Sequence, residues 1–130
     1  MRRLPLLLLL ASTIVCAAEA GEPPSIEPKT VGERLAWGDQ SLVVLDVRTP
    51  AEYAEGHVPG ALNIPHTELA ARIAELSAAR SRDIVVYCRS GNRTAQALKL
   101  LGDAGFTRLF HLKGDYLRWS EKERPVTRTQ

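Results

Sequence analysis

The chain has 130 residues, of which 17 are basic and 15 acidic, so its formal charge is +2 at neutral pH. This length is enough for one domain and short for two. The near-neutral charge gives no reason to expect a nucleic acid or an anionic membrane surface as a partner.

The first 20 residues have the pattern of a secretory signal peptide. A short basic head, MRR, precedes the apolar run LPLLLLLASTIVCAA, and Ala18-Glu19-Ala20 is a small-x-small cleavage site. The apolar run is shorter than the roughly 20 residues of a spanning helix, which disfavours a retained membrane anchor. Val15 before Cys16 disfavours a lipid anchor as well. We therefore expect cleavage after Ala20, a periplasmic location and no membrane attachment afterwards.

Cleavage would leave residues 21–130, with 15 basic and 14 acidic side chains and with Cys88 as the one cysteine. Exported chains usually carry their cysteines in even number, tied in pairs. An unpaired cysteine indicates either an intermolecular disulfide or a free reactive thiol.

Residues 21–37 are expected to form an extended leader followed by a first helix. The leader, GEPPSIEPK, is rich in proline and glutamate. Thr30 and Glu33 have the spacing of a capping box and Gly38 is a stop signal, so the predicted helix covers 31–37.

Beyond this leader, apolar runs alternate with amphipathic helical segments. SLVVLDV at 41–47 and DIVVYC at 83–88 are typical of strands buried on both faces of a parallel sheet. The other expected elements are a helix after Thr49 that begins at Pro50, a short strand at 61–64, a helix capped by Thr67, a helix over about 93–103 closed by Gly105, a strand in TRLFHLKG and a final helix in DYLRWSEKE. This order indicates an α/β domain over 38–126, with a mainly parallel central sheet flanked by helices on both faces.

Cys88 ends the 83–88 strand and opens the turn CRSGNR, which leads into the next helix. Ligands of parallel sheets bind at the carboxyl ends of the strands, so chemistry is expected here. The free N–H groups of the helix start, together with a positive φ at Gly91, would form an anion-binding nest. Arg89 and Arg93 add positive charge. These surroundings favour the thiolate form of a cysteine, so we expect Cys88 to be a nucleophile rather than a packing residue.

Other cysteine chemistries fit this turn less well. His57, His66 and His111 lie far from Cys88 in the sequence and are interpreted as loop or surface groups, so a Cys-His protease pair has no local support. Cysteine phosphatases use Cys-x5-Arg, whereas Arg93 follows here at Cys-x4-Arg. The tighter ring suits a single sulfur atom better than a phosphate.

Two segments together resemble the single-domain rhodaneses, in particular the small periplasmic and phage-shock types: VLDVRTPAEYAEGHVPGALNIP at 44–65 and IVVYCRSGNRTAQALKLLGDAGFTRLFHLKGDYLRW at 84–119. The resemblance implies a rhodanese-like fold and an active-site loop of six residues that begins with the persulfide-forming cysteine, here Cys88. It implies sulfur transfer from thiosulfate to cyanide, a thiol or an acceptor protein, with no metal and no organic cofactor. The donor and the persulfide sulfur would be bound by the rest of the loop, namely Arg89, Ser90, Gly91, Asn92 and Arg93.

The resemblance also implies a supporting network of charges. Asp46 and Arg48 would form a salt bridge at the end of the first buried strand, and we extend this network to Glu52. Asp115 departs from the family, which commonly has a glycine at this place, and its charge would oppose a thiolate.

Three further residues match the family and are expected to be structural: His57, Pro59 and Trp119. Two alternatives to a thiosulfate sulfurtransferase stay open. One is a low-turnover persulfide carrier or sulfur sensor that works with a partner protein. The other is an enzyme acting on oxyanions such as arsenate or phosphate, which the short loop disfavours.

Overall fold

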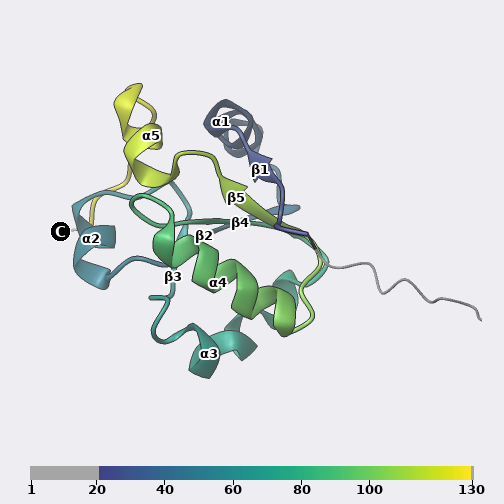
Figure 1. Ribbon diagram of the computed structural model, residues 1–130. Helices are drawn as coiled ribbons and strands as arrows, with labels where there is room; N and C mark the ends of the chain where they lie inside the picture. The colour runs from purple at the N-terminus through teal and green to yellow at the C-terminus, as the bar shows by residue number, and fades with distance from the viewer. Residues whose placement is uncertain (1–20, 130) are drawn as a thin grey trace, which may run out of the picture.

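The computed structural model describes residues 21–129; the expected signal peptide and Cys16 lie outside the described residues. One parallel sheet runs through the middle of the domain, with the strand order β1-β5-β4-β2-β3 (Figure 1). Its strands are β1 (Ser25–Ile26), β2 (Leu42–Asp46), β3 (Leu62–Asn63), β4 (Asp83–Tyr87) and β5 (Leu109–Leu112). The expected α/β class with a parallel sheet is confirmed.

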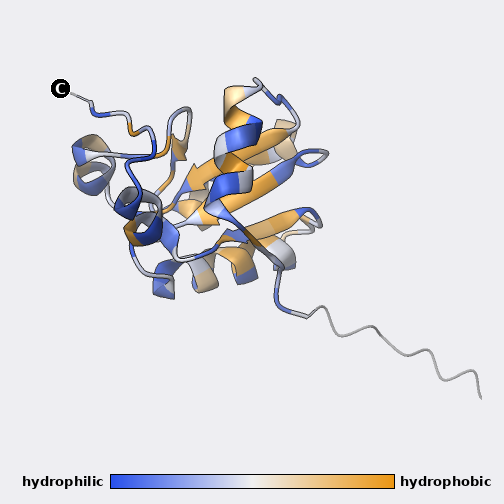
Figure 2. Ribbon diagram, turned by 90° about the horizontal axis from the view of Figure 1, so that it is seen from above, coloured by the Kyte–Doolittle hydropathy of each residue, from blue (hydrophilic) through white to orange (hydrophobic). Residues whose placement is uncertain are grey.

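Helices cover both faces of this sheet (Figure 1). On one face lie α1 (Pro28–Ala36) and α5 (Asp115–Glu121), and on the other α3 (Leu69–Arg72), the 3-10 helix η1 (Ile73–Ala79) and α4 (Asn92–Asp103). The short helix α2 (Pro50–Glu55) follows β2. Apolar side chains of the strands pack against both helix layers, and Figure 2 shows the hydrophobic sheet between them.

Local sequence signals account for the elements around Cys88. The Thr49 side chain accepts a hydrogen bond from the Glu52 N–H, and Glu52 reaches back to the N-cap backbone, so the expected capping box of α2 is confirmed. Every residue of β4 after Asp83 is buried, as its unbroken apolar run predicts.

No helix within residues 21–129 is long and apolar enough to cross a membrane.

Three expectations for the helices are wrong. The first helix begins at Pro28 rather than after Thr30, because proline at the first position starts it and the preceding leader is fixed to the sheet as β1. Thr67 does not cap the next helix, which begins at Leu69 and gives no side-chain cap hydrogen bond. That helix also changes to 3-10 geometry at Ile73 instead of continuing as one α-helix.

Candidate functional site

Cys88 lies at the carboxyl end of the central strand β4, directly before the loop to α4. The residue is 1% exposed, and its Sγ accepts a hydrogen bond from the Gly91 N–H at 3.0 Å. Helix α4 begins at the next residue, Asn92, so its positive end points toward the loop that holds the sulfur. The sulfur therefore lies beside a loop N–H donor and the start of a helix, an arrangement that suits a negative charge.

Gly91 is required at its position for two reasons. Its φ is +122°, a conformation that residues with a side chain rarely adopt. A Cβ at this place would also lie 3.2 Å from Oδ2 of Asp115. The expected positive φ in the loop is confirmed. The close approach of Asp115 is a second reason why this position needs a glycine.

The two loop arginines have different surroundings. The guanidinium of Arg93 donates two hydrogen bonds to the carboxylate of Glu52, at 2.7 and 3.0 Å. Arg89 is exposed and has no ion-pair partner among the residues 21–129. Glu52 thus contacts the loop rather than extending the Asp46–Arg48 pair, and one of the two expected free charges is neutralised. Ser90 and Asn92 are exposed.

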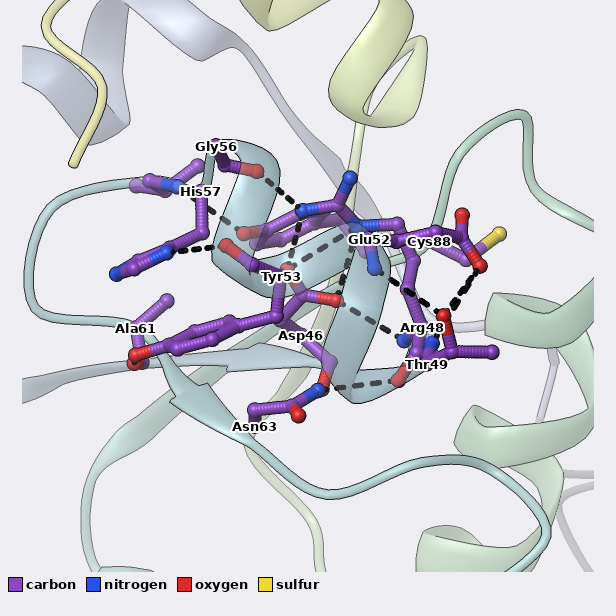
Figure 3. Close-up of polar contacts among 12 residues, drawn as sticks. Asp46, Arg48, Thr49, Glu52, Tyr53, Gly56, His57, Ala61, Asn63 and Cys88 are labelled. Atoms are coloured by element: carbon purple, nitrogen blue, oxygen red, sulfur yellow. Dashed lines mark hydrogen bonds and ion pairs between the residues drawn. The ribbon is translucent and has the colours of Figure 1, made fainter. Parts of the chain in front are cut away.

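Asp46 and Arg48 form a buried ion pair beside the loop (Figure 3). Arg48 Nη2 donates to Asp46 Oδ2 at 2.6 Å and to the Gly56 carbonyl at 2.7 Å. The guanidinium also lies 4.2 Å from the ring centre of Tyr116 and 5.4 Å from that of Tyr87. The pair joins the end of β2 to α2 and to α5, which makes it part of the scaffold.

Two of the residues expected to be structural, His57 and Trp119, are buried away from the sulfur. His57 is buried, its ring stacks on Tyr53 with the centroids 3.5 Å apart, and Nδ1 bonds the Tyr53 carbonyl at 2.7 Å. Trp119 is 1% exposed and packs in the core with α1. Neither side chain reaches Cys88 by a hydrogen bond.

A cavity of about 290 Å³ opens between the loop, α2 and α5. Its volume lies just below the range for ligand pockets, about 300–1,000 Å³, so any ligand in it would be small. It is lined by Arg48, Glu52, Glu55, Gly56, Arg89, Tyr116, Leu117 and Ser120.

Sequence reasoning missed the contact of His111 with this site. Asp115 Oδ1 accepts hydrogen bonds from the Cys88 N–H at 3.0 Å and from Thr94 Oγ1 at 2.8 Å, while Oδ2 is 2.8 Å from His111 Nε2. The (i, i+4) spacing of His111 and Asp115 across a strand end and a helix start gave no signal, because the turn between them decides whether the two side chains meet. Within the described part of the chain no group of three or more His, Cys, Asp and Glu side chains is arranged to hold a metal ion.

Comparisons with known proteins show the family of this chain. Residues 27–122 match the model of the family described as the rhodanese-like domain. A sulfurtransferase of Allochromatium vinosum is 38% identical over 101 residues, which cover 78% of this chain and 92% of that protein. Thiosulfate sulfurtransferase 16 of Arabidopsis thaliana is 32% identical over 120 residues, covering 85% of this chain and 98% of that protein. Other relatives are longer, and the chain spans 57% of the length of one and 28% of another.

A solved structure also has a similar fold. The crystal structure of the Alr3790 protein from Anabaena sp. aligns with a TM-score of 0.72 at 36% identity, covering 79% of this chain and 81% of that one. The resemblance of the two motifs to the rhodaneses is thereby confirmed, and the names of the relatives support sulfur transfer in general. With a family match over most of its length, this chain belongs to the rhodanese family.

Proposed function

We propose that this protein is a thiosulfate sulfurtransferase that carries sulfur as a persulfide on Cys88. The observation that carries the proposal is the Gly91 N–H at 3.0 Å from Cys88 Sγ, at the start of a helix whose dipole favours negative charge. The name of the Arabidopsis relative supports thiosulfate as the donor.

The reaction takes two balanced steps. The Cys88 thiolate attacks the outer sulfur of thiosulfate, a sulfur–sulfur bond forms to Sγ, and the old bond breaks with its electron pair leaving on sulfite. A thiophile, cyanide or a thiolate, then attacks the terminal persulfide sulfur and returns Cys88 as a thiolate. Charge is conserved in both steps, and backbone donors of the loop hold the anionic sulfur between them.

Arg89 would attract the donor. It is exposed and lines the cavity of about 290 Å³, where its positive charge would draw a small dianion toward the loop. Arg93 contributes less, because the Glu52 carboxylate already neutralises its charge.

Intact mass spectrometry tests the proposal. The wild-type protein should gain one sulfur after exposure to thiosulfate and release one sulfite, and Cys88→Ser should do neither. Cyanide should then remove the added sulfur as thiocyanate. A wild-type protein that keeps a free Cys88 thiol and gains no sulfur would overturn thiosulfate as the donor.

A low-turnover persulfide carrier is the second candidate, and the Glu52–Arg93 pair favours it. With Arg93 neutralised, one exposed arginine of the loop is left to attract a dianionic donor. A carrier would accept sulfur from a persulfide donor protein and would turn over slowly with thiosulfate and cyanide. Comparing the two donors on the same preparation separates the candidates.

We also propose that the protein is exported and works in the periplasm. The basic head, the apolar run and the Ala18-Glu19-Ala20 site support this location. Expression of the full chain followed by fractionation should give a periplasmic protein whose mass begins at Gly21. A cytoplasmic protein that retains Met1 would contradict the proposal.

A further inference from the structure

Asp115 is an unusual residue for the place it occupies beneath the Cys88 loop. It is 2% exposed and has a φ of +54°, a conformation that costs energy for residues other than glycine and that aspartate tolerates better than most. Its carboxylate bonds the backbone N–H of Cys88, the hydroxyl of Thr94 and the ring of His111. A strained residue with three specific contacts at the nucleophile indicates a function for the side chain.

His111 connects this buried carboxylate to solvent. Its side chain is 29% exposed, and its Nε2 lies 2.8 Å from Asp115 Oδ2. The ring also approaches the loop, since a Cβ on Gly91 would lie 3.6 Å from its Cε1. Other charged groups lie around the pair: Glu22 before β1, and Lys99 with its ion-pair partner Asp103 on α4, line the same hollow as His111. Arg89 and Arg93 are the charged residues of the loop itself.

The charge of the pair depends on the protonation of His111. The hydrogen bond and the charge of Asp115 raise the pKa of His111, and Glu22 adds to the effect. Burial alone would raise the pKa of Asp115, but the hydrogen bonds from His111, Cys88 and Thr94 lower it below its usual 3.8. Asp115 therefore stays charged, and the net charge of the pair changes from zero to −1 when His111 loses its proton.

We propose that His111 and Asp115 form a titratable pair that sets the electrostatic potential at Cys88 and thereby controls the reaction with anionic donors. The protonated pair is neutral and leaves the loop donors to act on the sulfur. The deprotonated pair places an uncompensated negative charge beneath the sulfur and repels an incoming anion. Both residues act through the loop rather than on the substrate, and the inference rests on the proposed function only where it concerns thiosulfate.

Alkylation of Cys88 with two reagents of similar size tests the potential directly. The rate ratio of iodoacetate to iodoacetamide cancels the thiolate fraction, which both reagents share, and reports the charge near the sulfur. In the wild type this ratio should fall by about threefold as the pH rises through the titration of His111. His111→Gln should give the low ratio at every pH. Asp115→Asn, which keeps the hydrogen-bond acceptor, should never fall below the high ratio, because its pair is neutral or positive.

A pair that only holds the loop in shape would move both rates together and leave the ratio flat with pH. That result overturns the proposal. Because neither reagent contains sulfane sulfur, failure here is distinct from failure to take sulfur from thiosulfate.

NMR titration of His111 gives a second readout that needs no reactive thiol reagent. If the proton on His111 changes the potential at Cys88, a negative charge on Cys88 must in turn favour that proton, because coupling between two sites is reciprocal. The pKa of His111 should therefore be about 0.5 pH unit higher in the wild type than in Cys88→Ser. The chain has three histidines, and His111→Gln identifies the signal. Equal His111 titrations in the two proteins would overturn the coupling even if a variant at Asp115 failed to fold.

Discussion

Replacing Glu52 by glutamine tests how the last arginine of the loop is held. The Glu52 carboxylate accepts two hydrogen bonds from Arg93, at 2.7 and 3.0 Å, and the two side chains are 28% and 25% exposed. The hydrogen bond from Arg93 is the main cause that lowers the pKa of Glu52 from 4.5 to about 2. Glutamine keeps the length of the side chain and a cap for α2, and it removes the charge.

The size of the effect follows from this geometry. The lowered pKa of Glu52 sets an upper bound of roughly 3 kcal/mol, and solvent screening of a partly exposed pair reduces it. Charged hydrogen bonds contribute about 1.5–3 kcal/mol and exposed ion pairs about 0.2–1 kcal/mol. We therefore expect Glu52→Gln to lower the free energy of unfolding by about 1–2 kcal/mol near neutral pH.

The pH dependence has a definite sign. Because the pKa of Glu52 is lower in the folded state, its contribution is complete above 4.5 and is lost as the pH falls toward about 2. Urea denaturation at about pH 7 and about pH 3 measures the difference between wild type and variant, which should narrow at the lower pH.

Glu55→Gln is the matched control for this experiment. Glu55 lies on the same helix, lines the same cavity and changes the net charge equally. It makes no ion pair among the residues that the structure describes, so its loss should cost less than about 0.5 kcal/mol. Two results would show that the bidentate pair does not hold Arg93. One is equal stability of the two variants near neutral pH, and the other is a difference between wild type and Glu52→Gln that does not narrow in acid.

Three further predictions concern single residues of the site. Arg48→Met should lower the free energy of unfolding by about 3–5 kcal/mol in urea denaturation, because it leaves Asp46 buried without its partner; a loss below about 1 kcal/mol would contradict the scaffold role. Gly91→Ala should cost about 1–3 kcal/mol and slow sulfur uptake from thiosulfate, because of the positive φ and the nearby Asp115, whereas a wild-type rate would show that the loop adapts. Arg89→Met should raise KM for thiosulfate, and Arg89→Lys should restore part of the affinity. Added salt should raise the KM of the wild type, because it screens the charge of Arg89. A KM that is independent of salt and equal in all three proteins would exclude steering by Arg89.

The sequence predicts the sheet and the loop well because their signals are local. The apolar runs around Leu45 and Val86 demand burial on both faces, and the Thr49-Pro50 cap fixes where α2 begins. In the loop, the lone Gly91 and the flanking cations indicate an anion nest without knowledge of the partners. Each of these signals lies within a few residues of the element it specifies.

The parts that sequence reasoning missed depend on contacts between distant segments. Strand β1 has only two residues, and it forms because Pro24 and Ile26 offer carbonyls to the edge of β5. The partner of Arg93 is Glu52, 41 positions earlier in the chain, and no spacing rule connects them. His111 lies beside Gly91 of the loop and bonds Asp115, whose carboxylate accepts the hydrogen bond of the Cys88 N–H.

The charges around Cys88 are arranged in compensating pairs, and this explains what the loop selects. Arg93 is neutralised by Glu52, and Asp115 is compensated by His111 whenever the imidazole is protonated. The net field at the sulfur then comes from backbone donors and from Arg89, so anion binding depends on the shape of the loop more than on total charge. The six-residue loop directs the Gly91 N–H at the sulfur, and in our proposal the loss of the proton from His111 changes the charge beside it. We therefore expect the shape of the loop and the sensitivity to pH to depend on different residues, which variants at Gly91 and at His111 should separate.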